Sequence, residues 1–368
     1  MSRGKVCHLS SVHQTKDVRI FHKECVSLAE AGFDVSLVVP GEEDHVDQGV
    51  SIVVVPASRS RKERLLVTGR QVLKRAMEVD AQLYHFHDPE LFPIGLWLKS
   101  KGKKVIFDSH EDLPRQVLNK PWIPKSVRKP LSLASEAAEH FGVRRLDAVI
   151  GATPLIRDRF AAVGARAEVI HNYPMLEELD VGSVEWSSRQ RQALYVGGIT
   201  AIRGAREMLR ASAFCDANWV IAGPVEEALR PELEAAQSDR FRLAGYLSRP
   251  EVVSELRQAM VGLCVLHPTI NYIDSIPIKL FEYMAAGIPV IASDFPFWRE
   301  LVGDSGAAVF VDPLDPQAIG RAIQTLIDDP ERAEAMGAAG KARVHSGFHW
   351  GVERDRLVRL YDDLLAAS

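Results

Sequence analysis

The stretch between residues 274 and 293 combines polar side chains that could bind an anion with a predicted helix that would present them. Lys279 lies in the first turn of this helix, where the helix macrodipole disfavours a cation. A bound phosphate would remove that conflict, because helix N-termini and ammonium groups both attract anions. Glu282 follows three residues later on the same face and could accept hydrogen bonds from hydroxyl groups. The alternative is a surface lysine paired with Glu282, and the spacing alone leaves both interpretations open.

A glycine-rich turn follows the predicted strand at 192–196. Gly197 and Gly198 would allow a ligand to approach the backbone closely, and Arg203 could reach a phosphate. The turn lacks the spacing of a Walker P-loop. Two later strands also end in glycine, and the residues there are Gly223, Gly245 and the neighbouring Tyr246. These glycines could be simple turn glycines, whereas Tyr246 could flank a base.

In the first half, a polar loop after the first predicted strand opens a helix and carries His13, Asp17 and Arg19. These side chains could bind a second substrate. The loop lacks the GxGxxG spacing of a dinucleotide site. For Asp17 the alternative role is that of a helix cap, because an aspartate at this position accepts bonds from the free N–H groups of the first turn.

The segment from His85 to Glu90 ends a strand and begins a helix. Asp88 stands before Pro89, a pair that suits a helix cap and first turn as well as it suits a binding site. His85 and His87 face the same way and have a spacing that can bind metal. Since no third ligand is nearby in sequence, we predict no metal ion here.

Four polar residues follow the predicted strand at 104–107, namely Asp108, His110, Glu111 and Asp112. Such a group at the carboxyl end of a buried strand favours a site over a plain turn. His110 is the best candidate for a substrate contact, because an imidazole can both donate and accept a hydrogen bond.

The elements that must position these residues alternate between short apolar strands and amphipathic helices, which predicts an α/β protein with two doubly wound parallel sheets. Ligands of such sheets bind at the carboxyl ends of the strands. We expect an N-terminal domain over residues 1–175, a second domain over 190–345, and a C-terminal helix within 346–368 that packs back towards the first domain. The predicted strands lie near 5–10, 34–39, 51–55, 82–86, 104–107, 147–150, 167–170, 192–196, 218–222, 240–243, 261–266, 288–292 and 307–310. The clearest predicted helices lie at 19–31, 63–78, 315–327, 330–344 and 352–365.

The composition argues against several classes of protein. A chain of 368 residues has room for two cores, and its net charge of −4 gives no case for binding nucleic acid. The four cysteines are scattered without CxxC spacing, so neither a zinc site of cysteines nor a disulfide framework is indicated. The apolar run at 6–9 is too short for a signal peptide, and no run approaches the roughly 20 residues that span a bilayer. We therefore expect a cytoplasmic protein.

Two basic segments lie in the first half. Residues 59–75 carry seven Lys/Arg against one glutamate, and residues 115–129 carry five cations without an acidic residue. Ile123, Val127 and Leu131 recur every four residues, which predicts a cationic amphipathic helix. Such a face could rest on anionic lipid or be an ordinary solvated surface. We expect peripheral binding at the inner membrane face.

Taken together, the Gly197-Gly198 turn with Arg203 and the stretch 274–293 resemble the donor half of retaining glycosyltransferases of family four, which have the GT-B fold. The helix-opening loop at 10–19 and the segments 85–91 and 108–112 resemble a bacterial branch that builds surface polysaccharides. The resemblance implies two Rossmann-like domains facing each other across a cleft. It also implies that a nucleotide-diphosphate sugar binds to the second domain, that the acceptor binds to the first, and that neither a metal nor another cofactor is needed.

The resemblance also implies roles for single residues. Glu282 matches the family's second glutamate, which binds the nucleotide ribose, and His110 matches the histidine that faces the transferred sugar. Two positions depart from the family pattern: the first glutamate is Asp274, and the first basic residue is Gly198, so Lys279 would supply the missing charge. The catalytic residues implied are His110, Arg203 and Lys279. The donor-binding residues implied are Gly197, Gly198, Gly223, Gly245, Tyr246, Asp274, Ser275 and Glu282. The acceptor-binding residues implied are His13, Asp17, Arg19, His87 and Asp88.

We therefore expect a glycosyltransferase that moves a sugar to a glycan or lipid-linked glycan, with retention of anomeric configuration. Two alternatives remain. One is a nucleotide-sugar epimerase or hydrolase on the same fold, and the other is a non-catalytic protein that binds sugar nucleotides.

Overall fold

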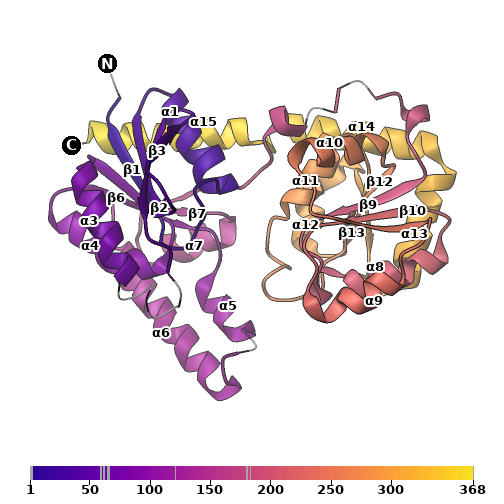
Figure 1. The fold of residues 1–368 in the computed structure, drawn as a ribbon, viewed down its shortest axis with the longest axis horizontal. Coiled ribbons are helices and arrows are strands. Elements are labelled where there is room, and N and C mark those ends of the chain that lie inside the picture. The colour runs from indigo at the N-terminus through magenta and orange to yellow at the C-terminus, as the bar shows by residue number, and fades with distance from the viewer. Residues whose placement is uncertain are drawn as a thin grey trace. The chain divides into compact units, whose positions relative to one another are not determined.

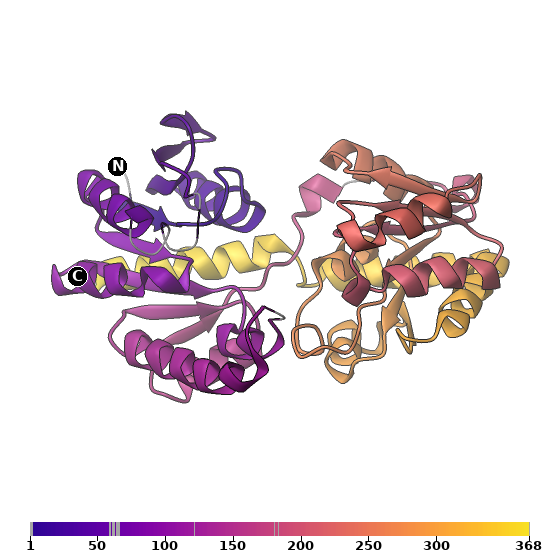
Figure 2. The same cartoon turned by 60° about the horizontal axis from the view of Figure 1, so that its bottom comes forward.

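The chain forms two compact units in a computed structural model, which describes residues 3–58, 60, 63, 67–120, 122–179, 181, 182 and 184–367 (Figure 1). The first unit consists of Met1–Asn172 and Gly351–Ser368, and the second consists of Tyr173–Trp350. Each unit has a largely parallel sheet with helices on both of its faces (Figures 1 and 2). No helix among the described residues is long and apolar enough to cross a bilayer.

The sheet of the first unit has the strand order β3-β4-β2-β1-β5-β6-β7-β8. All neighbouring strands pair in parallel except β3, which is antiparallel to β4. The strands are β1 (Lys5–Leu9), β2 (Asp34–Pro40), β3 (His45–Asp47), β4 (Val50–Val55), β5 (Leu83–Phe86), β6 (Lys104–Ser109), β7 (Ala148–Gly151) and β8 (Ala167–Val169). The order reverses between β1 and β5, which is the switch point where a doubly wound sheet opens a crevice for ligands.

The sheet of the second unit has the order β11-β10-β9-β12-β13-β14 and is parallel throughout. Its strands are β9 (Gln192–Val196), β10 (Asn218–Ala222), β11 (Phe241–Gly245), β12 (Val261–Cys264), β13 (Val290–Ser293) and β14 (Ala308–Val311). The central strands β12 and β13 are buried along their whole length, as a sheet covered on both faces requires. The switch point lies between β9 and β12.

The helices divide between the two units. Those of the first unit are η1 (Val18–Cys25), α1 (Val26–Glu30), α3 (Gly69–Val79), η3 (Pro89–Leu91), α4 (Phe92–Ser100), α5 (Leu113–Asn119), α6 (Lys125–Val143), α7 (Pro154–Ala161) and α15 (Trp350–Ala366). Those of the second unit are η4 (Leu176–Leu179), η5 (Trp186–Ser188), η6 (Ala201–Arg203), α8 (Ala205–Ala211), η7 (Ser212–Phe214), η8 (Glu227–Leu229), α9 (Arg230–Ala235), α10 (Arg249–Gln258), α11 (Ile278–Ala285), α12 (Pro296–Val302), η9 (Gly303–Ser305), α13 (Pro316–Asp328) and α14 (Pro330–His345).

The two predicted doubly wound sheets are confirmed, and every predicted strand is present. The strand β3 was not predicted, because only one of its three residues is apolar and two of them are exposed. The helix predicted at 19–31 is a π-helical segment, η1, followed by the short helix α1. Of the helix predicted at 63–78, the structure has α3, whereas 64–66 and the basic residues Arg59, Arg61 and Lys62 lie outside the described residues.

The last helix, α15 (yellow in Figure 2), belongs to the first unit. Side chains along its length tie it there. Glu353 bonds to His171, and Asp362 pairs with Arg3 at 2.7 Å. Tyr361 is fully buried, and its hydroxyl reaches the imidazoles of strands β1 and β5. The chain thus returns to the first unit through both apolar packing and polar contacts.

Candidate functional site

The ammonium of Lys279 lies at the centre of the candidate site in the second unit. Helix α11 begins directly after Pro277, which is its N-cap. The Nζ atom is buried and has no hydrogen-bond partner among the described residues. It lies 3.8 Å from the centre of the Tyr195 ring, a contact that stabilises a cation on an aromatic face. Burial lowers the pKa of Lys279 to about 8, and the neighbouring Arg203 adds to this effect.

Glu282 does not pair with this lysine. Its Oε1 accepts a hydrogen bond from Nη2 of Arg249 at 2.8 Å, and Arg249 also bonds to Glu178 at 3.0 Å. The alternative of a surface lysine paired with Glu282 is therefore wrong, because this carboxylate is engaged elsewhere and the lysine head group is buried. Arg249 was not singled out in the sequence, since an arginine at a helix start after a serine gives no distinctive pattern.

Three glycine turns meet at the carboxyl ends of β9, β10 and β11. A Cβ on Gly197 would lie 2.9 Å from Nζ of Lys279, and a Cβ on Gly198 would lie 2.9 Å from Nη1 of Arg203. The glycines thus leave room for the two cations. Gly223 has a φ of +134°, and a Cβ there would lie 2.0 Å from the carbonyl oxygen of Gly197, so only glycine allows these turns to pack.

Arg203 is half-buried in the same part of the unit, and its Nε donates to the hydroxyl of Tyr272 at 3.2 Å. Two basic groups therefore lie beside the Gly197-Gly198 turn. Tyr195 and Tyr272, which hold these cations, were not predicted, because a tyrosine within or after an apolar strand looks like an ordinary core residue.

The other predicted donor residues lie around this centre with varied exposure. Tyr246 is 84% exposed, and the carbonyl of Gly245 accepts a bond from Gly223 N–H at 2.7 Å. Asp274 and Ser275 are half-buried in the loop before α11. The Ser275 hydroxyl donates to the carbonyl of Tyr272 at 3.0 Å, which fixes the loop close to Arg203. The donor-binding roles of these residues stay predictions.

In the first unit, Asp108 at the end of β6 is held by Arg19. The guanidinium donates from Nε and Nη2 to the two carboxylate oxygens at 2.9 and 3.0 Å, and from Nη1 to the carbonyl of Ile170 at 3.1 Å. Although burial raises the pKa of Asp108, the charges of Arg19 and His110 outweigh it, and the pKa lies well below its ordinary value. Because all its donor nitrogens are used, Arg19 positions Asp108, and this geometry does not favour direct contact with an acceptor.

His110 sits beside this carboxylate with its side chain 21% exposed. Its Nε2 lies 2.9 Å from Oδ2 of Asp108 and 3.1 Å from Nδ1 of His87. Nε2–H donates to Asp108, since a carboxylate can only accept, which leaves Nδ1 of a neutral ring as an acceptor for a ligand. This arrangement suits the predicted contact between His110 and a substrate, although it does not test it.

His13 and Asp88 also come together near His110. The His13 ring centre is 5.5 Å from that of His110, and its Nδ1 lies 3.4 Å from Oδ1 of Asp88. Burial raises the pKa of Asp88, but hydrogen bonds from His13, Ser10 and Ser11 N–H outweigh it and hold the pKa at about 2. Asp88 therefore joins the β1 and β5 loops.

Asp17 accepts bonds from Arg19 N–H and Ile20 N–H, as expected of a helix cap.

Two groups of described side chains have the types and spacing to hold a metal ion: His8, Glu24, His85 and His87 form one, and His87, Asp108 and His110 form the other. The further candidate ligands of His85 and His87 are thus close in space but distant in sequence. His8 lies on the neighbouring strand β1 and Glu24 on η1, and only the sheet brings them together. The prediction that no metal binds remains untested.

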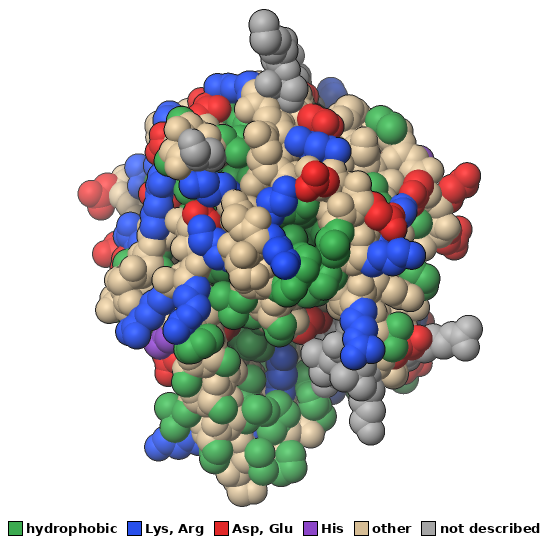
Figure 3. Space-filling model, turned by 90° about the vertical axis from the view of Figure 1, so that its left-hand side faces the viewer, with side chains coloured by type: hydrophobic (Ala, Val, Ile, Leu, Met, Phe, Trp, Pro, Cys, Tyr) green, Lys and Arg blue, Asp and Glu red, His purple; other side chains and the backbone are tan. Residues whose placement is uncertain are grey.

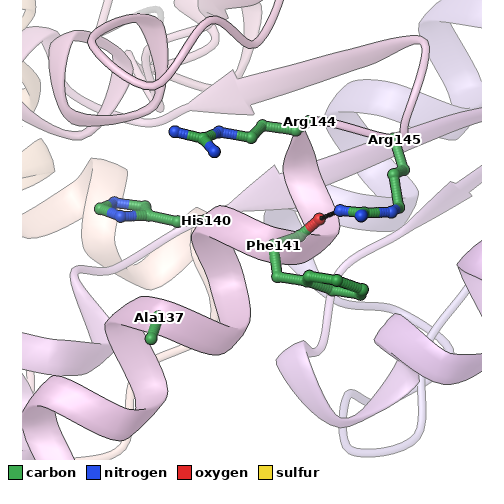
Figure 4. Close-up of a pocket in the computed structure, with 5 residues that line it drawn as sticks. All are labelled: Ala137, His140, Phe141, Arg144 and Arg145. Atoms are coloured by element: carbon green, nitrogen blue, oxygen red, sulfur yellow. Dashed lines mark hydrogen bonds between the residues drawn. The ribbon is translucent and has the colours of Figure 1, made fainter.

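An open hollow lies away from both groups, at the C-terminal end of α6 (Figure 4). It is lined by Ala137, His140, Phe141, Arg144 and Arg145. The Arg145 guanidinium lies 3.6 Å from the centre of the Phe141 ring and donates to the Phe141 carbonyl at 2.6 Å. None of the predicted site residues lines this hollow.

Two family models match the chain and together span most of it. The model described as "Glycosyl transferase 4-like domain" matches residues 19–175, and the model described as "Glycosyl transferases group 1" matches residues 178–343. The first match thus falls on the first unit and the second on the unit that holds Lys279.

Two proteins of known activity are similar to this chain over much of their length. A phosphatidyl-myo-inositol mannosyltransferase of Mycolicibacterium smegmatis is 24% identical over 362 residues, which cover 93% of this chain and 88% of that protein. An alpha-D-kanosaminyltransferase of Streptomyces kanamyceticus is 24% identical over 62% of this chain, and the match spans 63% of the relative's length.

Solved structures show the same fold at low identity. Sucrose-phosphate synthase from Thermosynechococcus elongatus superposes with a TM-score of 0.78 at 18% identity, covering 99% of this chain and 100% of that one. HepE of Anabaena, solved in complex with UDP-glucose, superposes with a TM-score of 0.72 at 13% identity. The match covers 98% of this chain and 100% of the HepE chain. The matched models, the curated relatives and the two doubly wound sheets agree, and the chain belongs to the GT-B glycosyltransferases of family four.

Proposed function

We propose that this glycosyltransferase transfers a sugar from a nucleotide-diphosphate sugar to a glycan or lipid-linked glycan, with retention of anomeric configuration. The observation that carries the proposal is the buried Lys279 ammonium, which has no hydrogen-bond partner among the described residues and lies at the first turn of α11. A buried, unpaired cation costs free energy unless an anion compensates it. A diphosphate would do so, and a complex with UDP-glucose is known for the structural relative HepE.

The proposed donor site assigns the diphosphate to Lys279, Arg203 and the backbone of the Gly197-Gly198 turn. These groups would meet the negative charge that develops on the leaving diphosphate, and such preorganised stabilisation is usually a large part of catalysis. With two cations of the chain in this role, the transfer step needs no metal ion. Glu282 would bind the ribose hydroxyls, with Arg249 holding its carboxylate in place. The remaining donor contacts are assigned to Gly223, Gly245, Tyr246, Asp274 and Ser275.

Retention would follow from attack of the acceptor on the same face from which the diphosphate leaves. No carboxylate of the described site is proposed as a covalent nucleophile. His110 is assigned to the transferred sugar through Nδ1, with Asp108 holding its ring. His13, Asp17, Arg19, His87 and Asp88 are assigned to the acceptor side. Of these, Arg19 acts by positioning Asp108, and the buried His87 acts through its contact with His110.

A lipid-linked acceptor would suit the surface of α6. Hydrophobic side chains gather over the part of the first unit that holds this helix (Figure 3). The exposed members on and before α6 are Trp122, Val127, Leu131, Leu133 and Phe141. Lys125, Arg128 and Lys129 accompany them in the first turns. Apolar side chains beside cations favour an anionic bilayer surface, and we propose peripheral binding at the inner face of the cytoplasmic membrane.

The proposal is tested by measuring nucleotide diphosphate release from a panel of donor sugars, with and without candidate glycan acceptors. Release that requires an acceptor, and a product with the donor's anomeric configuration, would support it. Conversion of the donor without any acceptor would favour an epimerase or hydrolase. Donor binding without turnover under any condition would favour a non-catalytic binding protein.

A further inference from the structure

Four buried side chains of the first unit direct nitrogen and oxygen atoms at one point. They are His8 on β1, Glu24 on η1, and His85 and His87 on β5, and one ligand atom from each lies within 4.8 Å of all the others. Oε2 of Glu24 is 3.8 Å from Nδ1 of His8 and 3.9 Å from Nε2 of His87. These side chains are essentially inaccessible to solvent. Three imidazoles and one carboxylate are a set of ligands that zinc accepts.

Two members of this cluster have polar atoms that the described residues do not satisfy. Neither carboxylate oxygen of Glu24 forms a hydrogen bond, although Oε1 lies 3.0 Å from Nε of Arg19, and Nε2 of His85 has no partner. Leaving such buried groups unsatisfied costs free energy. A cation at the point where the four side chains meet would bind the carboxylate of Glu24.

The outer nitrogens of His8 and His87 already have the partners that metal-bound histidines use. Nδ1 of His87 lies 3.5 Å from Oδ2 of Asp108. Nε2 of His8 lies 2.9 Å from the hydroxyl of Tyr361 on α15. Nδ1 of His85, which lies 3.9 Å from Oε2 of Glu24, is 2.8 Å from the same hydroxyl. A carboxylate or hydroxyl that accepts the outer N–H fixes the ring so that the inner lone pair faces a metal.

We propose that His8, Glu24, His85 and His87 bind a structural Zn²⁺ ion. Imidazole nitrogens are the ligands that zinc shares with copper and nickel, and a four-membered set that leaves no open position is typical of structural zinc. The 3.0 Å contact between Nδ1 of His8 and Nε2 of His87 is within the separation of two neighbouring ligands of one tetrahedral ion. The ion would join β1, β5 and η1, and through Tyr361 it would tie α15 to this core.

This proposal goes beyond the sugar transfer argued above and does not depend on it. The ion would lie in the core of the first unit and take no part in binding the diphosphate, which is assigned to Lys279 and Arg203. It would act on the reaction only by holding His87 and Asp108, the two groups that contact His110.

The test is the metal content of the full chain, purified without a polyhistidine tag and dialysed against a weak chelator. We expect one Zn²⁺ per chain in the wild type and none in His85→Phe, which keeps the ring volume but removes the ligand. His171→Phe is the matched control, because His171 also faces a buried glutamate of this unit, Glu353, but lies outside the cluster. The control should retain the ion.

A milder pair of variants guards against misfolding. Tyr361→Phe removes the hydroxyl beside His8 and His85 and should weaken Zn²⁺ binding about 10- to 100-fold. Tyr84→Phe removes a buried hydroxyl that bonds only to the backbone of residues 76 and 81, and it should leave the affinity unchanged. Zn²⁺ should also raise the unfolding temperature of the metal-stripped wild type, and Co²⁺ should give the visible spectrum of a tetrahedral site.

Two results would overturn the proposal. A wild-type chain that binds neither Zn²⁺ nor Co²⁺, with an unfolding temperature that neither ion changes, would leave the cluster as a metal-free hydrogen-bond network. Zinc retained equally by the wild type and a folded His85→Phe variant would assign the ion to another part of the chain.

Discussion

At the scale of single residues, the proposed donor site depends most on the charge of Lys279. The sequence left an anion site and a surface ion pair equally open, and the described structure rejects the ion pair because Glu282 bonds to Arg249. The lysine head group lies on the face of Tyr195, beside the backbone of Gly197. Such a cation is stabilised by an aromatic ring but keeps its hydrogen-bond donors for a ligand.

Lys279→Met should weaken donor binding by tenfold or more, on the order of the 1.5–3 kcal/mol that a hydrogen bond to a charged group contributes. The methionine keeps the length of the side chain and fits the buried site, so the unfolding temperature should not fall. Calorimetry with the preferred nucleotide sugar measures the affinity. Lys341→Met is the control, because Lys341 is the other lysine of the second unit and lies on α14.

The pH dependence of donor binding gives an independent test of the same residue. Burial lowers the pKa of Lys279 to about 8, so the free protein carries the charge below that pH and loses it above. A bound diphosphate favours the ammonium form, so the wild-type dissociation constant should rise as the pH increases from 8 to 9. In Lys279→Met the constant should be larger but flat over this range. A wild-type constant that is flat over the same range would contradict the assignment.

His110→Ala should lower kcat about 100-fold and leave the dissociation constant of the nucleotide diphosphate unchanged, because the first unit is not proposed to bind the diphosphate. The control is His45→Ala, which alters an exposed histidine of β3 in the same unit. Equal losses of kcat in both variants would contradict the assignment of His110 to the transferred sugar.

At the scale of elements, the glycine turns set the shape of the donor site. Gly223→Ala should lower the free energy of unfolding by about 1–3 kcal/mol, since its Cβ would meet the Gly197 carbonyl at 2.0 Å and its φ of +134° is strained for alanine. Gly306→Ala is the matched control, because Gly306 also has a positive φ but has open space around its Cβ position. Denaturant unfolding of both variants measures the difference, and equal losses would show that packing of the turns is unimportant.

The helix α6 carries the prediction of membrane binding. The double variant Leu133→Ser, Phe141→Ser should reduce co-sedimentation with anionic vesicles several-fold, because it removes two exposed apolar side chains from this helix. Leu314→Ser, at an exposed leucine of the second unit, is the control. Binding that is equal for anionic and neutral vesicles and insensitive to salt would dismiss the basic residues as its cause.

At the scale of the whole molecule, the alternation of apolar strands and amphipathic helices was sufficient to predict both sheets. Buried parallel strands give continuous apolar runs, and glycine or polar residues mark their carboxyl ends. The short polar strand β3 gives no such signal. The sequence also pointed to Lys279, Arg203 and His110, because each follows a strand or opens a helix.

The contacts between distant residues could not be predicted in the same way. Arg249 is 33 positions from Glu282, and Tyr361 is 353 positions from His8, so no spacing rule connects them. The metal-ligand cluster is the clearest case, because His8 and His85 are neighbours only through the pairing of β1 with β5. A pattern read along the chain identifies the ends of strands, whereas the order of the strands decides which ends meet.

The most direct test of the account is a turnover assay that compares the wild type with Lys279→Met and Lys341→Met. Each protein is given a nucleotide-diphosphate sugar with and without a glycan acceptor, and the released nucleotide diphosphate and the anomeric configuration of the product are measured. We predict acceptor-dependent release with retention in the wild type and in Lys341→Met, and at least tenfold slower release in Lys279→Met at limiting donor concentration. Equal rates in all three proteins, or a product with inverted configuration, would contradict the central claim.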